Sequence, residues 1–305
     1  MAAKAFDPTP YTGIHARCDN PIHAAVLLEN STISRTVYRP GTVDWVMFDQ
    51  AVVLQESTAE YLYSDFTPLH QRYVRGTRIY LEKIVDAVTA GLTDERAKAL
   101  ALLDWCRDIP WTYTRGAWLT GGDAGGELFF GGAEEEVIRK GSCICNEQAR
   151  VLGILAQIAG LPSRYVGHMT LIDYDNVRSS TGHGVNEIYV EGKWAYFDIR
   201  GRYFVKDDGS LASAWDLIKD PGLIHRQPPE VLAHRCPRAD HSLADAYYRP
   251  TTVTIIANYL AADHGSYDYA WVYPSASLAR EAREAGRRIR VTRHRDLLPQ
   301  PKLRI

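Results

Sequence analysis

Apolar residues recur every three or four positions in three stretches of the chain, and this spacing predicts amphipathic helices. The expected helices span residues 77–90, 93–109 and 146–159. Gly91 and Gly160 follow the first and third stretches, at the position where a helix commonly ends. Pro110 limits the second helix, because the residue before a proline is disfavoured in the helical conformation.

A second pattern, rich in β-branched and aromatic residues, predicts strands after the third helix. The expected strands span residues 164–174, 184–190, 193–199 and, further on, 252–259. Two residues, Glu191 and Gly192, separate the second strand from the third, which suits a tight hairpin turn. Short helices are expected at 213–218 and 278–288. Helices followed by consecutive strands indicate an α+β fold with an antiparallel sheet, rather than a parallel α/β sheet.

The 305 residues are expected to form one compact domain, 1–305. Its core is expected at about residues 75–205, with an N-terminal cover over 1–74 and a C-terminal extension over 206–305. Within the core, residues 116–132 are rich in glycine and predict a long loop. Such a loop is either functional or a plain surface excursion, and the sequence favours neither.

Charge and composition exclude several classes of protein. The formal net charge is −2, which gives no electrostatic reason to expect nucleic acid or an anionic membrane as a partner. No apolar run reaches the length of a membrane span, and the first residues lack the apolar run of a signal peptide. The five cysteines are irregularly spaced and odd in number, so a disulfide framework is not expected and a reducing cytoplasm is the expected location.

Three residues suggest nucleophilic catalysis. Cys145 lies at the first turn of the helix expected at 146–159, where the helix dipole stabilises a thiolate. His183 opens the second expected strand, and Asp198 ends the third. The hairpin between these strands brings the carboxylate close to the imidazole across the ladder. A thiol facing an imidazole that is oriented by a carboxylate is the arrangement used for acyl transfer.

Four short motifs carry a resemblance to the transglutaminase-like superfamily. They are CNEQA at 145–149, LPSRYV at 161–166, HGVNEIY at 183–189 and KWAYFD at 193–198. Their order, spacing and residue types resemble that family over roughly residues 90–200. The resemblance implies a papain-like core, a thiolate–imidazolium pair and a thioester intermediate. It also implies that Cys145 is the nucleophile, His183 the acid-base and Asp198 the orienting carboxylate.

The chain departs from the family pattern at two places. Cys143 stands two residues before the nucleophile, where the family often has glycine. Gly184 and Val185 follow His183, where the family commonly has alanine and tryptophan. The backbone N–H of Cys145 is one candidate donor to an oxyanion.

Three further residues are candidates for substrate binding. Trp111 and Tyr113 lie in a segment that resembles the aromatic segment before the family's active-site loop, and either is a candidate second oxyanion donor. His168 follows the third helix on a strand and is a candidate for the wall of the cleft.

Neither a metal nor an organic cofactor is expected. Cys143 and Cys145, with His168 or His183, form a poor zinc signature because no second close pair of ligands exists. The carboxylates near residues 173–176 lack the glycine and the terminal glutamate of a calcium loop. The chemistry of the triad needs no cofactor.

The expected function is attack by Cys145 on an amide, ester or thioester carbonyl. Water as the acceptor gives a protease or amidase, and an amine gives an acyltransferase or cross-linker; hydrolysis of a peptide-like amide is slightly favoured. Two other readings stay open: a catalytically inactive binding module on the same fold, and lyase or isomerase chemistry on the same triad. The sequence indicates no particular substrate and no oligomeric state.

Overall fold

A computed structural model describes eleven parts of the chain. They are residues 18, 24, 51–64, 73–109, 133–140, 145–171, 180–199, 202–234, 252–258, 270–271 and 291–292. The helices are α3 (Glu56–Ser64), α4 (Ile79–Val88), α5 (Glu95–Asp108), α7 (Glu134–Lys140), α8 (Cys145–Ile158), α9 (Ala214–Lys219), the 3-10 helix η3 (Pro221–Ile224) and α10 (Pro229–Ala233). The strands are β1 (Val52–Leu54), β2 (Ser163–Leu171), β3 (Ser180–Val190), β4 (Lys193–Asp198), β5 (Arg202–Tyr203), β6 (Thr252–Ala257), β7 (Ala270–Trp271) and β8 (Val291–Thr292).

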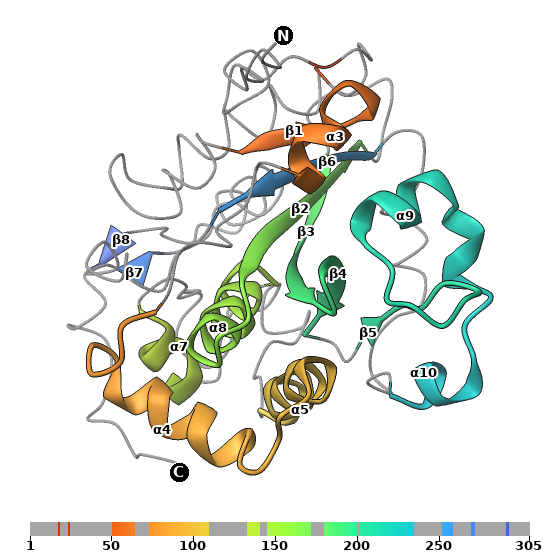
Figure 1. Cartoon of the computed structure of the whole chain (residues 1–305). Helices are drawn as coiled ribbons and strands as arrows, with labels where there is room; N and C mark the ends of the chain where they lie inside the picture. The colour runs from red at the N-terminus through yellow and green to blue at the C-terminus, as the bar shows by residue number, and fades with distance from the viewer. Residues whose placement is uncertain are drawn as a thin grey trace, which may run out of the picture.

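The main sheet has six strands in the order β1-β6-β2-β3-β4-β5, and every neighbouring pair is antiparallel. The α+β expectation is therefore confirmed, with helices α4, α5, α7 and α8 grouped together in Figure 1. Strand β6 comes from far along the sequence and inserts between β1 and β2. The sheet thus draws strands from outside residues 75–205, the stretch expected to form the core.

The hairpin expected at Glu191 and Gly192 is confirmed. Val190 pairs with Lys193, and the two turn residues have φ angles of 55° and 76°. Positive φ at both central residues is the geometry of a type I′ turn, whose twist matches that of the flanking strands. Because the turn fixes the register, it also fixes which residues of β3 and β4 lie on the same face.

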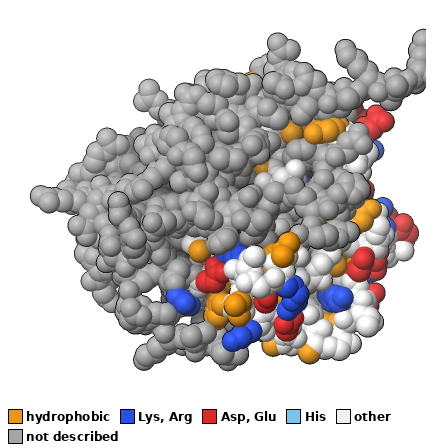
Figure 2. Space-filling view, turned by 60° about the vertical axis from the view of Figure 1, so that its left-hand side comes forward, with side chains coloured by type: hydrophobic (Ala, Val, Ile, Leu, Met, Phe, Trp, Pro, Cys, Tyr) orange, Lys and Arg blue, Asp and Glu red, His pale blue; other side chains and the backbone are white. Residues whose placement is uncertain are grey.

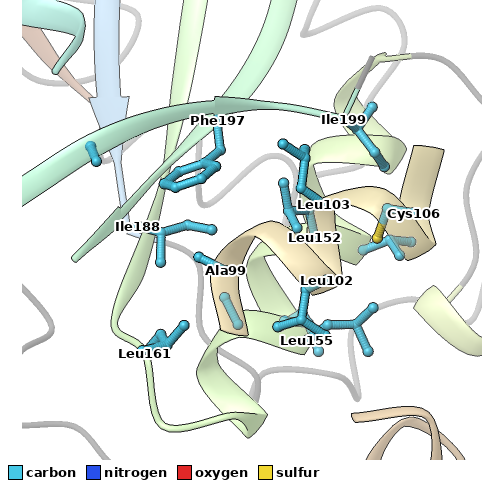
Figure 3. Close-up of a cluster of buried hydrophobic side chains, with 14 of the residues drawn as sticks. Ala99, Leu102, Leu103, Cys106, Leu152, Leu155, Leu161, Ile188, Phe197 and Ile199 are labelled. Carbon is cyan, nitrogen blue, oxygen red and sulfur yellow. The ribbon is translucent and has the colours of Figure 1, made fainter. Parts of the chain in front are cut away.

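The two faces of the sheet carry separate hydrophobic cores. Alternate residues of β3 and β4, such as Ile188 and Phe197, pack with α5 and α8 on one face. Figure 3 shows side chains of α5, α8 and the sheet converging in this core. The other face contributes Val185 and Tyr196 to a second core, together with residues of α3 and α9. We call these the α8 face and the α3 face.

Helix α8 differs from the expected amphipathic helix. Only one face of this helix was expected to be buried, but every residue from Asn146 to Ala156 is buried. The reason is that α8 is covered by the sheet on one side and by α4, α5 and α7 elsewhere. Its polar residues are therefore buried as well, and Glu147 and Arg150 are 0% and 1% exposed.

The other expected elements agree to within a few residues at their ends. Helix α5 begins one position after Asp94, whose side chain accepts a hydrogen bond from the backbone N–H of Ala97 at 2.7 Å. Strand β3 begins at Ser180, four residues earlier than expected. The glycine-rich stretch 116–132 and the helix expected at 278–288 lie outside the described residues.

The surface carries charges of both signs. Figure 2 shows acidic and basic side chains interspersed over the described part of one face. Among the helices that the structure describes, none has the length and apolar character needed to cross a membrane.

Candidate active site

Cys145 is the first residue of α8, a helix of 14 residues. Its side chain is partly exposed, although residues Asn146 to Ala156 of the helix are buried. At this position the helix dipole and the first backbone N–H groups favour a negative charge on sulfur. Cys145 therefore lies at a position where the helix N-terminus favours a thiolate.

His183 and Asp198 form a buried pair on β3 and β4. Nε2 of His183 lies 2.9 Å from Oδ2 of Asp198, and the two side chains are 3% and 1% exposed. An ionised carboxylate only accepts hydrogen bonds, so Nε2 of His183 carries the hydrogen and its N–H donates a hydrogen bond to Asp198. The remaining ring nitrogen, Nδ1, is then the one that can exchange a proton with a thiol.

The electrostatic surroundings favour the imidazolium form of His183. Burial alone would lower the pKa of this histidine, but the charge and hydrogen bond of Asp198, together with a hydrogen bond to Cys145, raise it. The thiol of Cys145 and the carboxylate of Asp198 therefore both act on the pKa of this imidazole. The expected proximity of Cys145, His183 and Asp198 is thus seen in the structure.

The sheet register places His183 near the end of the β3–β4 ladder. His183 lies on the α3 face, because it alternates with Val185 on β3, whereas α8 covers the opposite face. Strand β4 pairs with β3 only between Val190 and Asn186. Beyond Asn186, within the described residues, the ladder with β4 stops. His183 therefore lies beyond the end of the β3–β4 ladder.

His168 lies directly opposite His183 in the β2–β3 ladder. It is 0% exposed, and its Nδ1 lies 3.0 Å from Oγ1 of Thr254 on β6. Burial, with a smaller contribution from the charge of His183, lowers the pKa of His168 to about 3. The other residues expected near the cleft, Trp111 and Tyr113, lie outside the described residues, as does Cys143.

A buried ion-pair network holds α8 in place and was not anticipated from the sequence. Glu134 at the start of α7 lies 2.5 Å from Nη2 of Arg78 and 3.2 Å from Nε of Arg150 on α8. Glu135 also pairs with Arg78. The side chains of Arg78, Glu134 and Arg150 are at most 1% exposed. Charged residues are rarely this buried. Charged positions on a helix therefore normally indicate a face exposed to solvent when only the sequence is known.

A second buried network involves two residues of the family motifs. Nε and Nη2 of Arg164 donate to Oε2 of Glu187 at 2.8 and 2.6 Å. The guanidinium also lies over the rings of Tyr63 and Trp194, at 4.7 and 4.2 Å from their centroids. Arg164 and Glu187, which belong to the motifs but not to the triad, therefore connect α3, β2, β3 and β4 on the α3 face.

No cluster of three or more histidine, cysteine, aspartate or glutamate side chains suited to a metal ion occurs in the part of the chain that the structure describes. Cys143, which forms a poor zinc signature with Cys145 in the sequence, lies outside the described residues.

Comparisons with known proteins found a matching family. A sequence profile of the transglutaminase-like superfamily matches residues 82–199. No match was found among curated proteins.

Two solved structures are similar at 16% sequence identity. One is a protein of Cytophaga hutchinsonii designated provisionally as a cysteine protease; the match has a TM-score of 0.32 and covers 50% of this chain and 49% of the other. The second is a protein of Parabacteroides distasonis designated provisionally as a protease, with a TM-score of 0.29 and coverage of 48% and 29%. The chain thus spans about half the length of the first structure and less of the second. The profile match spans all three candidate catalytic residues.

Proposed function

We propose that this protein is a cysteine-nucleophile enzyme that acts on an amide or another acyl carbonyl. The observation that carries the proposal is the His183 imidazole, which is hydrogen-bonded to Asp198 and to Cys145. The match to the transglutaminase-like superfamily supports a cysteine-type enzyme in general. A half-buried thiol at a helix N-terminus, paired with an imidazole of raised pKa, is suited to nucleophilic attack.

Each member of the triad has a distinct role in the proposed reaction. Asp198 accepts the Nε2–H of His183 and so keeps Nδ1 directed at the thiol. Nδ1 takes the proton of Cys145, and the thiolate forms a bond to the carbonyl carbon. As the carbonyl is restored, the bond to the leaving group breaks, and His183 returns its proton to that group. The product of this half-reaction is a thioester on Cys145.

The second half-reaction repeats these steps with an acceptor. His183 removes a proton from water or an amine, the acceptor attacks the thioester, and the thiol is regenerated. We favour water and a peptide-like amide substrate, because water is far more abundant than any amine and needs no acceptor site. An amine acceptor would make the protein an acyltransferase or cross-linker instead.

The first test is the rate at which iodoacetamide alkylates each cysteine near neutral pH, followed by peptide mapping. Cys145 is expected to react fast, and at least about tenfold more slowly in His183→Ala, because the imidazolium no longer stabilises the thiolate. Cys106 is an internal control, since it is fully buried and burial raises its pKa. If Cys145 is alkylated no faster than Cys18, or at the same rate in His183→Ala, the hypothesis of a cysteine nucleophile is wrong. The hypothesis of a binding module is then favoured.

The second test uses peptide amides and esters as acyl donors, with a Cys145→Ala variant as the inactive control. Incorporation of labelled water into the product would identify a hydrolase, and incorporation of an added primary amine would identify a transferase. A product that contains neither would contradict acyl transfer and point to lyase or isomerase chemistry on the same triad.

A further inference from the structure

His168 lies on β2, the middle one of the three neighbouring strands β6, β2 and β3, next to the candidate triad. In the antiparallel ladders it lies opposite His183 on β3 and opposite Thr254 on β6. Residues directly opposite each other have Cβ atoms about 4.5–5.5 Å apart and point to the same face. The His168 side chain therefore stands beside the His183 side chain on the α3 face of the sheet.

Two contacts fix the plane of the His168 ring. Thr254 holds Nδ1 at 3.0 Å, and the ring of Tyr196 lies with its centroid 6.1 Å away at an interplanar angle of 34°. The two nitrogens of an imidazole point in divergent directions, so Nε2 is turned away from β6. Since β3 and β4 lie on the side of β2 away from β6, the ring is held against the strands that carry His183 and Asp198.

His168 is held neutral, whereas the surroundings of His183 favour its charged form. Burial keeps the first imidazole deprotonated at neutral pH, and the charges of His183 and Asp198 both act on it, in opposite senses. The titratable groups that face His183 include Asp198 from β4, Cys145 from α8 and His168 from β2. A neutral ring at this place adds no positive charge that would compete with the imidazolium for Asp198.

The geometry points to His168 as a positioning residue: a buried imidazole, anchored by Thr254, that packs against the His183–Asp198 pair and holds the His183 ring in its orientation toward Cys145. This inference rests on the proposed function of the triad. A ring held by Thr254 and lying directly opposite His183 in the ladder would limit the freedom of His183 to rotate away from Asp198. His168 would thus act through His183 rather than by touching a substrate.

The test is the pH dependence of Cys145 alkylation by iodoacetamide, which reports the thiolate and not turnover of any substrate. Thr254→Val removes the anchoring hydroxyl at nearly constant shape, and Thr254→Ser restores it. Thr252→Val is the matched control, because Thr252 is also buried and lies two residues away on the same face of β6. His168→Phe keeps a ring but removes both nitrogens.

Thr254→Val and His168→Phe are expected to slow alkylation at pH 6 by about tenfold, the effect of raising the thiol pKa by one unit. Thr254→Ser and Thr252→Val are expected to stay within about twofold of the wild type. A purely structural role would lower the melting temperature and leave the pH profile unchanged, and that result overturns the inference. If His168→Phe does not fold, the Thr254 and Thr252 variants decide. Failure of the proposed function itself looks different, because Cys145 would then be unreactive, or insensitive to His183→Ala, in the wild-type background.

Discussion

Replacement of Glu187 by glutamine changes one atom at the centre of a buried network. Oε2 of Glu187 accepts two hydrogen bonds from Arg164, at 2.8 and 2.6 Å. Oε1 accepts from the Tyr63 hydroxyl at 2.7 Å and from the backbone N–H of Ala214 at 2.8 Å. Glutamine can keep the second pair of bonds, but its NH₂ group would face the guanidinium donors of Arg164.

The magnitude follows from the burial of both partners. The side chains of Arg164 and Glu187 are 0% exposed, so the guanidinium would lose its counter-charge without gaining water. Removing one partner of a buried ion pair costs about 3–5 kcal/mol. Glu187→Gln is therefore expected to lower the free energy of unfolding by about that amount, which is a large fraction of the stability of a typical domain.

Urea unfolding followed by circular dichroism measures this change, with the slope m checked for each variant. Asp86→Asn is the matched control, because Asp86 pairs with Arg75 at 2.5 Å while both side chains are more than half exposed. The control is expected to change stability little, since exposed pairs are screened by water. Adding Arg164→Met to Glu187→Gln is expected to recover part of the loss, because the uncompensated charge is then gone. Equal effects of Glu187→Gln and Asp86→Asn would refute the reasoning.

Three further predictions follow from buried contacts. The pKa of His168 is lowered to about 3, so below pH 6.5 the unfolded chain binds a proton that the folded chain does not. As the pH is lowered from 6.5 to 3, the free energy of unfolding should then fall by up to about 1.4 kcal/mol per pH unit. Urea unfolding of His168→Gln should show a weaker dependence of this free energy on pH, and an unchanged dependence would contradict the prediction. Gly153→Ala should destabilise the protein by about 1–3 kcal/mol despite the better helix propensity of alanine, because the added Cβ would lie 2.8 Å from Nδ2 of Asn186; a rise in melting temperature would rule this out. Ser213→Ala should cost about 1 kcal/mol in urea unfolding, since Ser213 and Asp216 form the capping box of α9, and no loss would show that the cap is unimportant.

Local pattern was sufficient for most of the elements and for the approach of Asp198 to His183. The repeat of apolar residues located α4, α5 and α8, because helix formation depends on neighbours three and four positions away. The two-residue connection at Glu191 fixed the register of β3 and β4, and with it the approach of Asp198 to His183. The apolar repeat that follows Cys145 placed this residue at the N-terminus of a helix. Each of these inferences uses only residues close together in the sequence.

Tertiary structure alone decided which polar residues are buried and what they contact. Glu134 and Arg150 have the pattern of a solvated helix face, and only the packing of α7 against α8 shows that they form a buried ion pair. His168 gains its partner Thr254 because β6, some eighty residues later, inserts beside β2. The cost of burying a charge or an imidazole depends on partners that are distant in sequence, and a one-dimensional pattern does not contain them.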